Sequence, residues 1–298
     1  MPPMRVHKPR PSEAPASHRA SRRLRAVGLL PSVVTLLNLS SGFAAIYCCL
    51  LSIERAQGTF RGLTYLTLAG YLVLLAMVFD ALDGRLARLT RRTSDFGGQL
   101  DSLADVVSFG VAPAMMVIGL MMPVVHAEGA LGGSAWLARL LGRATGVACA
   151  IFACCAAIRL ARFNVENVHD ESAHLSFRGL PTPGAAAALV SLVLLHEEFV
   201  RNESAYVGWL VWLLPPAALL IGLAMVSRLR YVHVFNMFFK GRRPIRYLVG
   251  TVILLAALWI LQEIAIAVVA CGYALSGPGH YLATALAGRH RRHAPPSP

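Results

Sequence analysis

The feature that most constrains this chain is a series of apolar segments, each about as long as a bilayer is thick. A helix needs about 20 apolar residues to cross a hydrocarbon core of roughly 30 Å. Hydrocarbon cannot satisfy free backbone groups, so only helices or closed barrels span it, and these segments lack the alternation of barrel strands. The sequence therefore predicts an all-α, polytopic membrane helix bundle. Its six predicted core spans are 31–53, 62–82, 98–122, 142–163, 183–200 and 206–226.

A further apolar stretch, 245–275, is too long for one comfortable span. Gln262 and Glu263 interrupt it, so we expect two shorter or tilted helices with a turn near these residues. The total is then eight spans. An even number places the basic end of the chain on the same side as its N-terminus, and cytoplasmic loops are the ones that carry an excess of arginine and lysine. We expect the N-terminus, the end of the chain and the arginine-rich loops to face the cytoplasm.

The positive charge of the chain gathers at its ends and in short loops. Lys and Arg number 28 against 15 Asp and Glu, giving a formal net charge of +13. No soluble segment is long enough for a nucleic-acid-binding module, so the charge suits anionic membrane lipids and we expect no nucleic-acid partner. Residues 1–27 are rich in Pro, Ser, Ala and Arg and predict a disordered cytoplasmic tail. Residues 28–288 then form the transmembrane domain, and 289–298 a second basic tail.

Four aspartates lie at the predicted cytoplasmic ends of two consecutive apolar helices. Acids inside a membrane are costly and usually functional. Asp80 and Asp83 are spaced i, i+3, and Asp101 and Asp105 are spaced i, i+4, so each pair shares one helix face. If the two faces meet, four carboxylates converge.

Carboxylates packed together repel one another, and hard divalent cations with oxygen ligands relieve the repulsion. Mg²⁺ is typically held by a few carboxylates together with substrate phosphates, and paired metal ions assist phosphoryl transfer. Small residues between the acids leave room for a nucleotide or pyrophosphate, and Arg88 can offset phosphate charge. The alternative is a purely structural set of ion pairs between the aspartates and the arginines nearby, which are Arg85, Arg88, Arg91 and Arg92.

These residues resemble the signature of the CDP-alcohol phosphatidyltransferases, DxxDGxxARx8GxxxDxxxD, at every fixed position from Asp80 to Asp105. The resemblance implies six core transmembrane helices, a homodimer, and a cytoplasm-facing cavity for a CDP-linked donor and divalent metal, Mg²⁺ or Mn²⁺, as two ions. It implies that Asp80, Asp83 and Asp101 are metal ligands and that Asp105 is a metal ligand or the general base. The positions implied for binding the CDP donor are Gly84, Ala87, Arg88 and Gly97, with Ser94 as a further candidate.

Segments outside the signature look like the membrane-spanning phosphatidylserine synthases of this family. They read LPSVVTLLNLSSGFAAI in the first helix, RLARFN at the end of the fourth, and FRGLPTPGAAA before the fifth. The resemblance implies transfer of the phosphatidyl group from CDP-diacylglycerol to the hydroxyl of L-serine, with release of CMP. The composition indicates an integral, multi-pass membrane protein, and the loop charges indicate that its active site faces the cytoplasm. We expect the membrane to be a bacterial inner membrane.

Three other segments admit more than one interpretation. Arg159 and Arg162 can hold a serine carboxylate or a lipid phosphate bidentately, or can extend to anionic headgroups. Thr35 and Asn38 share a face of the first helix and either line the cavity or bond between helices. The run from Gly179 to Gly184 sets a rigid turn into the fifth span.

Other functions remain open from the residues alone. Within the same chemistry, glycerol 3-phosphate or inositol can replace serine as the acceptor. A divalent-cation or proton-coupled transporter also places acids in membrane helices, but it needs them near the midplane and reachable from both sides. A structural scaffold is the third hypothesis, and nothing structural requires four acids in this pattern.

Overall fold

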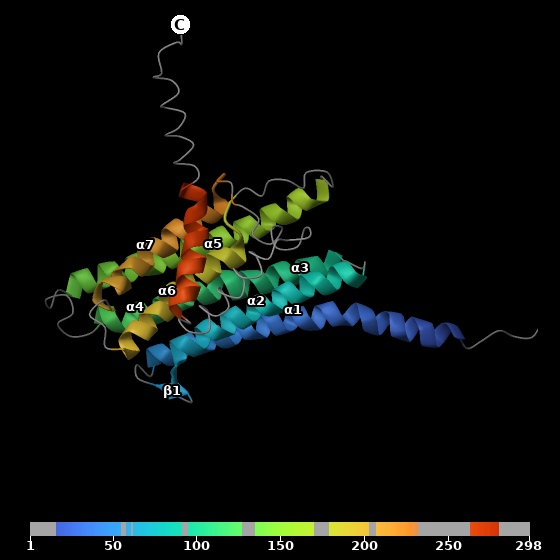
Figure 1. The fold of residues 1–298 in the computed structure, drawn as a ribbon, viewed down its shortest axis with the longest axis horizontal. Helices are drawn as coiled ribbons and strands as arrows, with labels where there is room; N and C mark the ends of the chain where they lie inside the picture. Colours follow the sequence, from blue (N-terminus) through green and yellow to red (C-terminus); the bar gives the residue numbers. More distant parts are fainter. Residues whose placement is uncertain are drawn as a thin grey trace, which may run out of the picture.

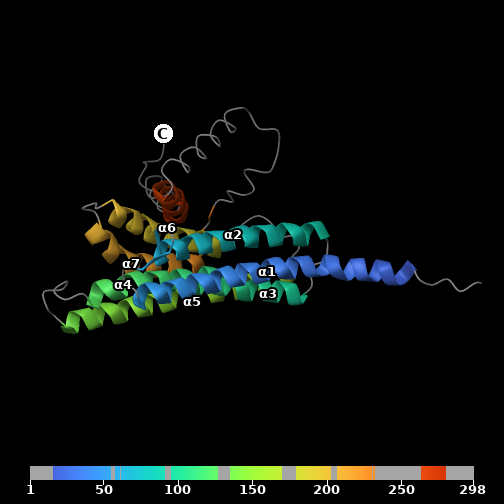
Figure 2. The ribbon, with the colours of Figure 1, turned by 90° about the horizontal axis from the view of Figure 1, so that it is seen from below.

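The computed structural model describes residues 16–54, 58–60, 62–90, 95–126, 135–169, 179–202, 207–229, 231 and 263–279. Within these ranges, six helices are long and apolar enough to cross a membrane. They pack lengthwise as an elongated bundle (Figures 1 and 2). The predicted helical bundle and its six core spans are therefore confirmed. The spans are Val33–Glu54, Tyr65–Leu86, Phe96–Val125, Ala135–Val165, Thr182–Arg201 and Trp209–Val226.

Seven α-helices form these six spans, because the span Phe96–Val125 consists of two α-helices joined by a π-helical segment, Val106–Val111. A small β-hairpin joins the first two helices, with Thr59 paired to Thr64. We call this end of the bundle the hairpin end. The elements are α1 Ala16–Glu54, β1 Thr59–Phe60, β2 Leu63–Thr64, α2 Tyr65–Thr90, α3 Asp95–Asp105, α4 Ala112–His126, α5 Ala135–His169, α6 Thr182–Arg201 and α7 Val207–Val226.

Helix α1 begins at Ala16, well before the first apolar span. This start differs from the disordered tail expected through residue 27. Arg, Ala and Leu dominate the segment before the span, and all three are good helix formers. Because extending an existing helix needs no new nucleation, the helix formed by the apolar span can continue toward the N-terminus through these residues. The boundaries of the transmembrane domain stay predictions, and residues 1–15 lie outside the described residues.

The helices approach one another closely where glycines face a neighbour. A Cβ placed on Gly70 of α2 would lie 2.6 Å from a methyl carbon of Leu194 on α6. A Cβ on Gly222 of α7 would lie 3.0 Å from the Cα of Phe152 on α5. Lipid supplies no hydrophobic force between helices, so close backbone packing of this kind is what holds a membrane bundle together. The outward-facing side chains are correspondingly large and apolar, as at Phe43, which is 67% exposed.

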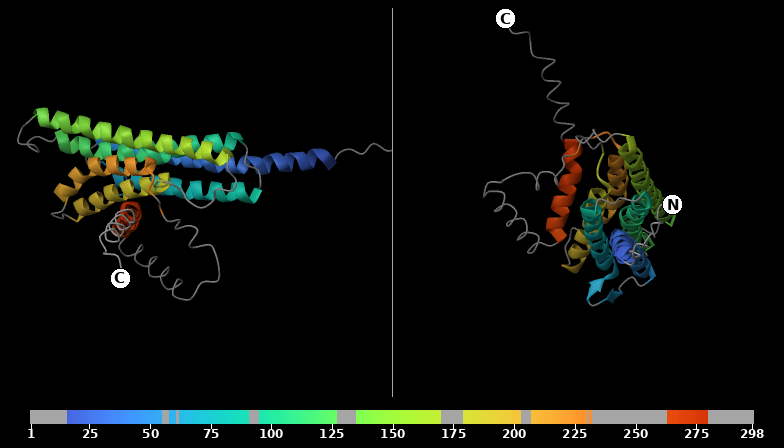
Figure 3. Two further views of the ribbon diagram at one scale, coloured as in Figure 1. Left: turned by 90° about the horizontal axis from the view of Figure 1, so that it is seen from above. Right: turned by 90° about the vertical axis from the view of Figure 1, so that its right-hand side faces the viewer.

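One further apolar helix, Glu263–Gly279, packs on α6 and is shorter than the six spans. It stands across the long direction of α1, α2 and α3 (red in Figures 1 and 3). Glu263 is 4% exposed and accepts a 2.8 Å hydrogen bond from the Tyr71 hydroxyl of α2. Arg201, at the end of α6, lies 3.5 Å from the same carboxylate. The rest of the predicted pair of C-terminal helices, including Gln262, lies outside the described residues, so the count of eight spans stays a prediction.

Candidate metal centre

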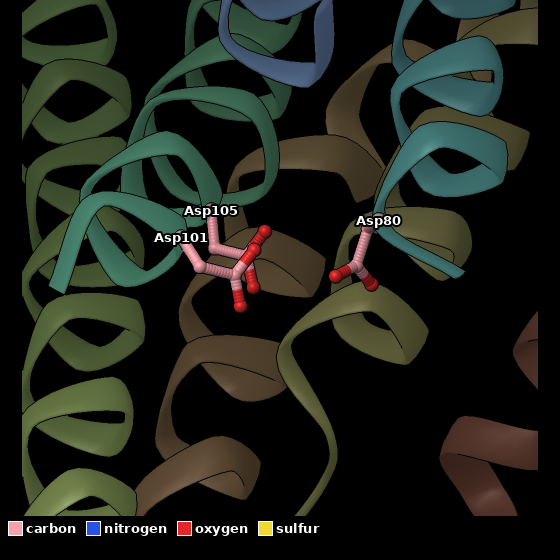
Figure 4. Close-up of side chains that lie close together, drawn as sticks. All are labelled: Asp80, Asp101 and Asp105. Atoms are coloured by element: carbon pink, nitrogen blue, oxygen red, sulfur yellow. The ribbon is translucent and has the colours of Figure 1, made fainter. Parts of the chain in front are cut away.

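Three carboxylates meet between α2 and α3, near the end of the bundle opposite the hairpin. Asp80 faces Asp101 and Asp105 across the gap between the two helices (Figure 4). One oxygen from each lies within 4.8 Å of the others, close enough to hold a metal ion. Asp105 is 7% exposed, and Asp80 and Asp101 are half-buried. The structure thus brings together three of the four aspartates that the sequence predicted to converge.

Asp83 lies outside this group of three although it is one helical turn from Asp80. Its side chain is buried, and it accepts a hydrogen bond from the Thr35 hydroxyl of α1. Asp83 is therefore held against α1 beside the cluster. Its predicted role as a metal ligand stays a prediction.

Helix α1 contributes side chains that hydrogen-bond to the acids of the site. Asn38 is fully buried, and its Nδ2 donates a 3.0 Å hydrogen bond to Oδ1 of Asp105. The sequence left open whether Thr35 and Asn38 line a cavity or bond between helices. In the structure both bond from α1 to acids of the site. Hydrogen bonds made to a metal-binding carboxylate by a residue that does not itself touch the metal orient that carboxylate and tune its affinity for the metal.

A π-helical segment, Val106–Val111, follows Asp105 directly. A π turn holds one residue more than an α turn, so it rotates the preceding side chains by about 100° relative to those that follow. Ser108 within it donates a 3.0 Å hydrogen bond to the backbone oxygen of Asn38. Gly42 allows this approach, because a Cβ there would lie 2.3 Å from Ser108 Oγ. The π segment therefore couples the face that carries Asp105 to α1, and no sequence pattern predicted it.

Several buried oxygens at this site have no hydrogen-bond partner among the described residues. They are Asp83 Oδ1, Asp101 Oδ1 and Asn38 Oδ1. Buried polar atoms are normally paired, and an unpaired carboxylate oxygen in an apolar bundle is costly. Divalent cations such as Mg²⁺ and Mn²⁺ prefer carboxylate oxygens, and a bound cation would supply the missing partner. The residues present thus fit a divalent metal site.

The predicted nucleotide-binding positions are only partly described. Gly84 is exposed, and a Cβ placed on it would meet no described residue within 4 Å, unlike the glycines that sit at helix contacts. Among the described residues, no neighbouring helix therefore packs against Gly84. Gly97 lies half-buried on α3. The side chains of Ala87 and Arg88, and all of Ser94, lie outside the described part of the structure.

The two candidate arginines for the acceptor lie on α5. Arg162 is exposed. Arg159 is half-buried, and its Nη1 lies 3.2 Å from where a Cβ of Gly179 would be. Asn164 of the same helix donates a 2.8 Å hydrogen bond to Ser102, the neighbour of Asp101, and ties the end of α5 to α3. Asn164 belongs to the RLARFN run, but the sequence alone gave it no role. Binding of serine or phosphate by Arg159 and Arg162 stays a prediction.

Known proteins match more than half of this chain. The H. pylori (strain J99) protein named CDP-diacylglycerol--serine O-phosphatidyltransferase is 37% identical over 168 residues, which are 55% of this chain and 60% of that protein. A protein of the same name from Methanocaldococcus jannaschii is 35% identical over 168 residues, 56% of this chain and 65% of that one. The Saccharomyces cerevisiae protein of that name is 38% identical over 165 residues, 53% and 51% respectively.

These alignments span less than two thirds of the length of the relatives. The sequence model of the CDP-alcohol phosphatidyltransferases matches residues 28–224, which include α2, α3, the π segment and all four aspartates of the signature. That range is well over half of the chain and contains the six predicted core spans except for the end of the last. The chain therefore belongs to the CDP-alcohol phosphatidyltransferase family.

Proposed function

We propose that this protein transfers the phosphatidyl group of CDP-diacylglycerol to the hydroxyl of L-serine, giving phosphatidylserine and CMP. The observation that carries the proposal is the meeting of Asp80, Asp101 and Asp105 within a family signature. The choice of serine rests on relatives from bacteria, an archaeon and yeast that bear the serine transferase name.

In the proposed reaction the serine oxygen bonds to the phosphorus that carries diacylglycerol, and the bond from that phosphorus to CMP breaks. Asp105 would accept the serine hydroxyl proton or serve as a further metal ligand, and Asn38 holds the Asp105 carboxylate in place through its 3.0 Å hydrogen bond. Asp80, Asp83 and Asp101 would hold divalent metal, with Mg²⁺ or Mn²⁺ as a pair of ions. When bound, such ions offset negative charge on the transferring phosphoryl group.

The surroundings of the acids favour this enzyme over a cation transporter. Beyond Asp105 toward the hairpin end, Ser108 and Phe109 are fully buried, and Gly42 lets α1 press directly against Ser108. Among the described residues, the aspartates thus have a packed core on one side and no helix contact at Gly84 on the other. A transport site needs access from both sides of the membrane, whereas a site for a phosphate-bearing lipid needs only one.

Three further features belong to the proposal. The excess of arginine in the predicted cytoplasmic loops supports an orientation with the aspartates toward the cytoplasm, by the positive-inside rule. The proposed membrane is a bacterial inner membrane. A homodimer stays a prediction that rests on family resemblance.

An acceptor screen tests the proposed function. Purified full-length protein with CDP-diacylglycerol and Mg²⁺ or Mn²⁺ receives serine, glycerol 3-phosphate or inositol, and CMP release is measured. We expect release with serine, with phosphatidylserine as the lipid product. Release with another acceptor and none with serine would overturn the substrate while leaving the chemistry intact. No release with any acceptor, in a folded protein that binds the donor, would overturn the chemistry.

A further inference from the structure

The segment Gly179–Gly184, which precedes and opens α6, is locked to the end of α7. Gly179 has φ +88°, its N–H donates a 2.8 Å hydrogen bond to the Leu229 oxygen, and a Cβ there would lie 2.3 Å from the Met225 oxygen. The N–H of the next residue, Leu180, donates a 3.1 Å bond to the Ala224 oxygen. Only glycine fits this first position, because both the backbone angle and the close oxygen exclude a side chain.

The helix Glu263–Gly279 presses on the other end of that segment through Tyr273. A Cβ on Gly184 would lie 2.9 Å from Cε1 of Tyr273. The rings of Tyr273 and Tyr231 lie 5.9 Å apart, and the Tyr231 hydroxyl donates a 3.2 Å hydrogen bond to the Ala274 oxygen. A Cβ on Gly277 would lie 2.4 Å from the Tyr231 ring. Tyr273 therefore packs between α6 and the ring of Tyr231, which is itself held by Ala274 and Gly277.

Arg159 completes the same group of contacts. Its Nη1 lies beside Gly179, 3.2 Å from where a Cβ on that glycine would be. A free arginine side chain loses rotamer entropy when it is fixed. Contacts that restrict the guanidinium before a ligand arrives reduce that cost at the moment of binding.

We propose that Tyr273 is a positioning residue for the acceptor: by packing on Gly184 and Tyr231 it holds Gly179–Gly184 in place, and so sets the orientation of the Arg159 guanidinium toward the carboxylate of the incoming acceptor. This inference rests on the proposed function. A planar guanidinium binds a carboxylate with two parallel hydrogen bonds, and that geometry is sensitive to orientation. The ring of Tyr273 makes the contact with Gly184, so the ring rather than the hydroxyl is required.

Four variants of the full-length protein test the proposal. Tyr273→Ala removes the ring, and Tyr273→Phe keeps it. Leu275→Ala is a control on the same helix, since Leu275 is 67% exposed. Glu263→Leu is a second control, because it disturbs the same helix at its contact with Tyr71, away from Arg159. For each variant, KM for serine, KM for CDP-diacylglycerol, kcat and the thermal midpoint are measured.

We expect Tyr273→Ala to raise KM for serine roughly tenfold, about the worth of one charge-assisted hydrogen bond, with kcat and KM for the donor near wild type. Tyr273→Phe should restore KM for serine, and neither control should move it, although Glu263→Leu lowers the thermal midpoint. If Tyr273→Ala raises KM for serine and KM for CDP-diacylglycerol by the same factor, Tyr273 has only a structural role. The same conclusion follows if KM for serine rises in proportion to the fall in thermal midpoint across all four variants. An unchanged KM for serine in Tyr273→Ala would overturn the proposal outright.

The wild-type protein separates this inference from the proposed function. If it releases CMP with serine and Tyr273→Ala behaves like wild type, the positioning role fails while the function stands. If it uses another acceptor instead of serine, the function fails, and the same four variants are compared with that acceptor. A selective rise in its KM then supports the positioning role, and no selective rise overturns it.

Discussion

Buried carboxylates occur in two regions along α2, and their surroundings differ. Near the hairpin end, Glu263 accepts a 2.8 Å hydrogen bond from the Tyr71 hydroxyl, and its carboxylate lies 3.5 Å from the Arg201 guanidinium. Toward the other end of α2, Asp80 faces Asp101 and Asp105, and Asp101 has a buried oxygen with no hydrogen-bond partner among the described residues. Glu263 thus has a hydrogen-bond donor and a nearby cation, whereas in the described part of the structure the three aspartates face one another.

The difference is the one expected between a structural acid and a functional one. Burial of a charge is tolerated when a cation and hydrogen bonds compensate it, as at Glu263, and such a group ties helices together. A cluster of like charges without a protein cation is tolerated only if a ligand completes it. The acids at Asp80, Asp101 and Asp105 should therefore govern activity, and Glu263 should govern stability.

The largest expected effect is at Asp101. Asp101→Asn keeps the shape of the side chain but removes a charged metal ligand, so we expect CMP release to be abolished while the fold survives. The assay is CMP release beside the elution profile in detergent. Leu103→Ala, on the exposed side of the same helix, is the matched control. Near-normal turnover in folded Asp101→Asn protein would show that Asp101 is not needed for catalysis and would contradict the distinction between the aspartates and Glu263.

Asp105→Asn sharpens the comparison by separating two roles within the cluster. If Asp105 is chiefly the general base, metal-dependent binding of CDP-diacylglycerol stays near wild type while single-turnover CMP release falls about 10² to 10⁴-fold. If it is chiefly a ligand, donor binding weakens as well. Wild-type values of both measurements would exclude either role.

Added Mg²⁺ or Mn²⁺ should stabilise the wild-type protein against heat, since a ligand that binds only the folded state shifts the unfolding equilibrium. At a free concentration of about 100 times Kd, the gain is about 2.7 kcal/mol. The shift should disappear in Asp101→Asn, remain in Glu263→Leu, and reverse on chelation. Equal shifts in both variants would mean that the ion binds elsewhere.

Asn38→Ala tests the support that α1 gives to Asp105. Loss of a residue that orients a metal-binding carboxylate typically costs about 10 to 100-fold in metal affinity or activity, and we expect a fall in that range. Metal affinity and kcat are measured together, with Leu37→Ala on the lipid-facing side of α1 as the control. A variant with full metal affinity and full kcat would reduce Asn38 to a packing residue.

The smallest effect on turnover is expected at Glu263. Glu263→Leu removes the acceptor for the Tyr71 hydroxyl, and a buried group left without its partner costs about 1 to 3 kcal/mol of stability. Turnover below the new melting temperature should stay near wild type. Thermal unfolding and CMP release are compared with Val268→Ala, an exposed position on the same helix. A large loss of turnover with unchanged stability would erase the distinction between the two regions.

Much of this protein follows from its sequence because the bilayer imposes strong rules. The length of each apolar run determined the six core spans, and the spacing of Asp80, Asp101 and Asp105 determined which helix faces carry the acids. Helical periodicity is local, so residues three or four apart share a face in any helix. The sequence also narrowed the chemistry to a CDP-linked donor, through a signature in which every fixed position matches.

Only the tertiary structure decided how these faces meet. The π segment after Asp105 rotates one half of the span against the other, and Ser108 within it packs closely on α1 at Gly42, which is distant in sequence. Likewise, the sequence marked Glu263 only as an interruption of an apolar run, whereas its partners Tyr71 and Arg201 come from two other helices. Whether a buried acid is paired within the protein depends on such distant contacts, and so only the packed bundle distinguishes Glu263 from the acids that we predict to be functional.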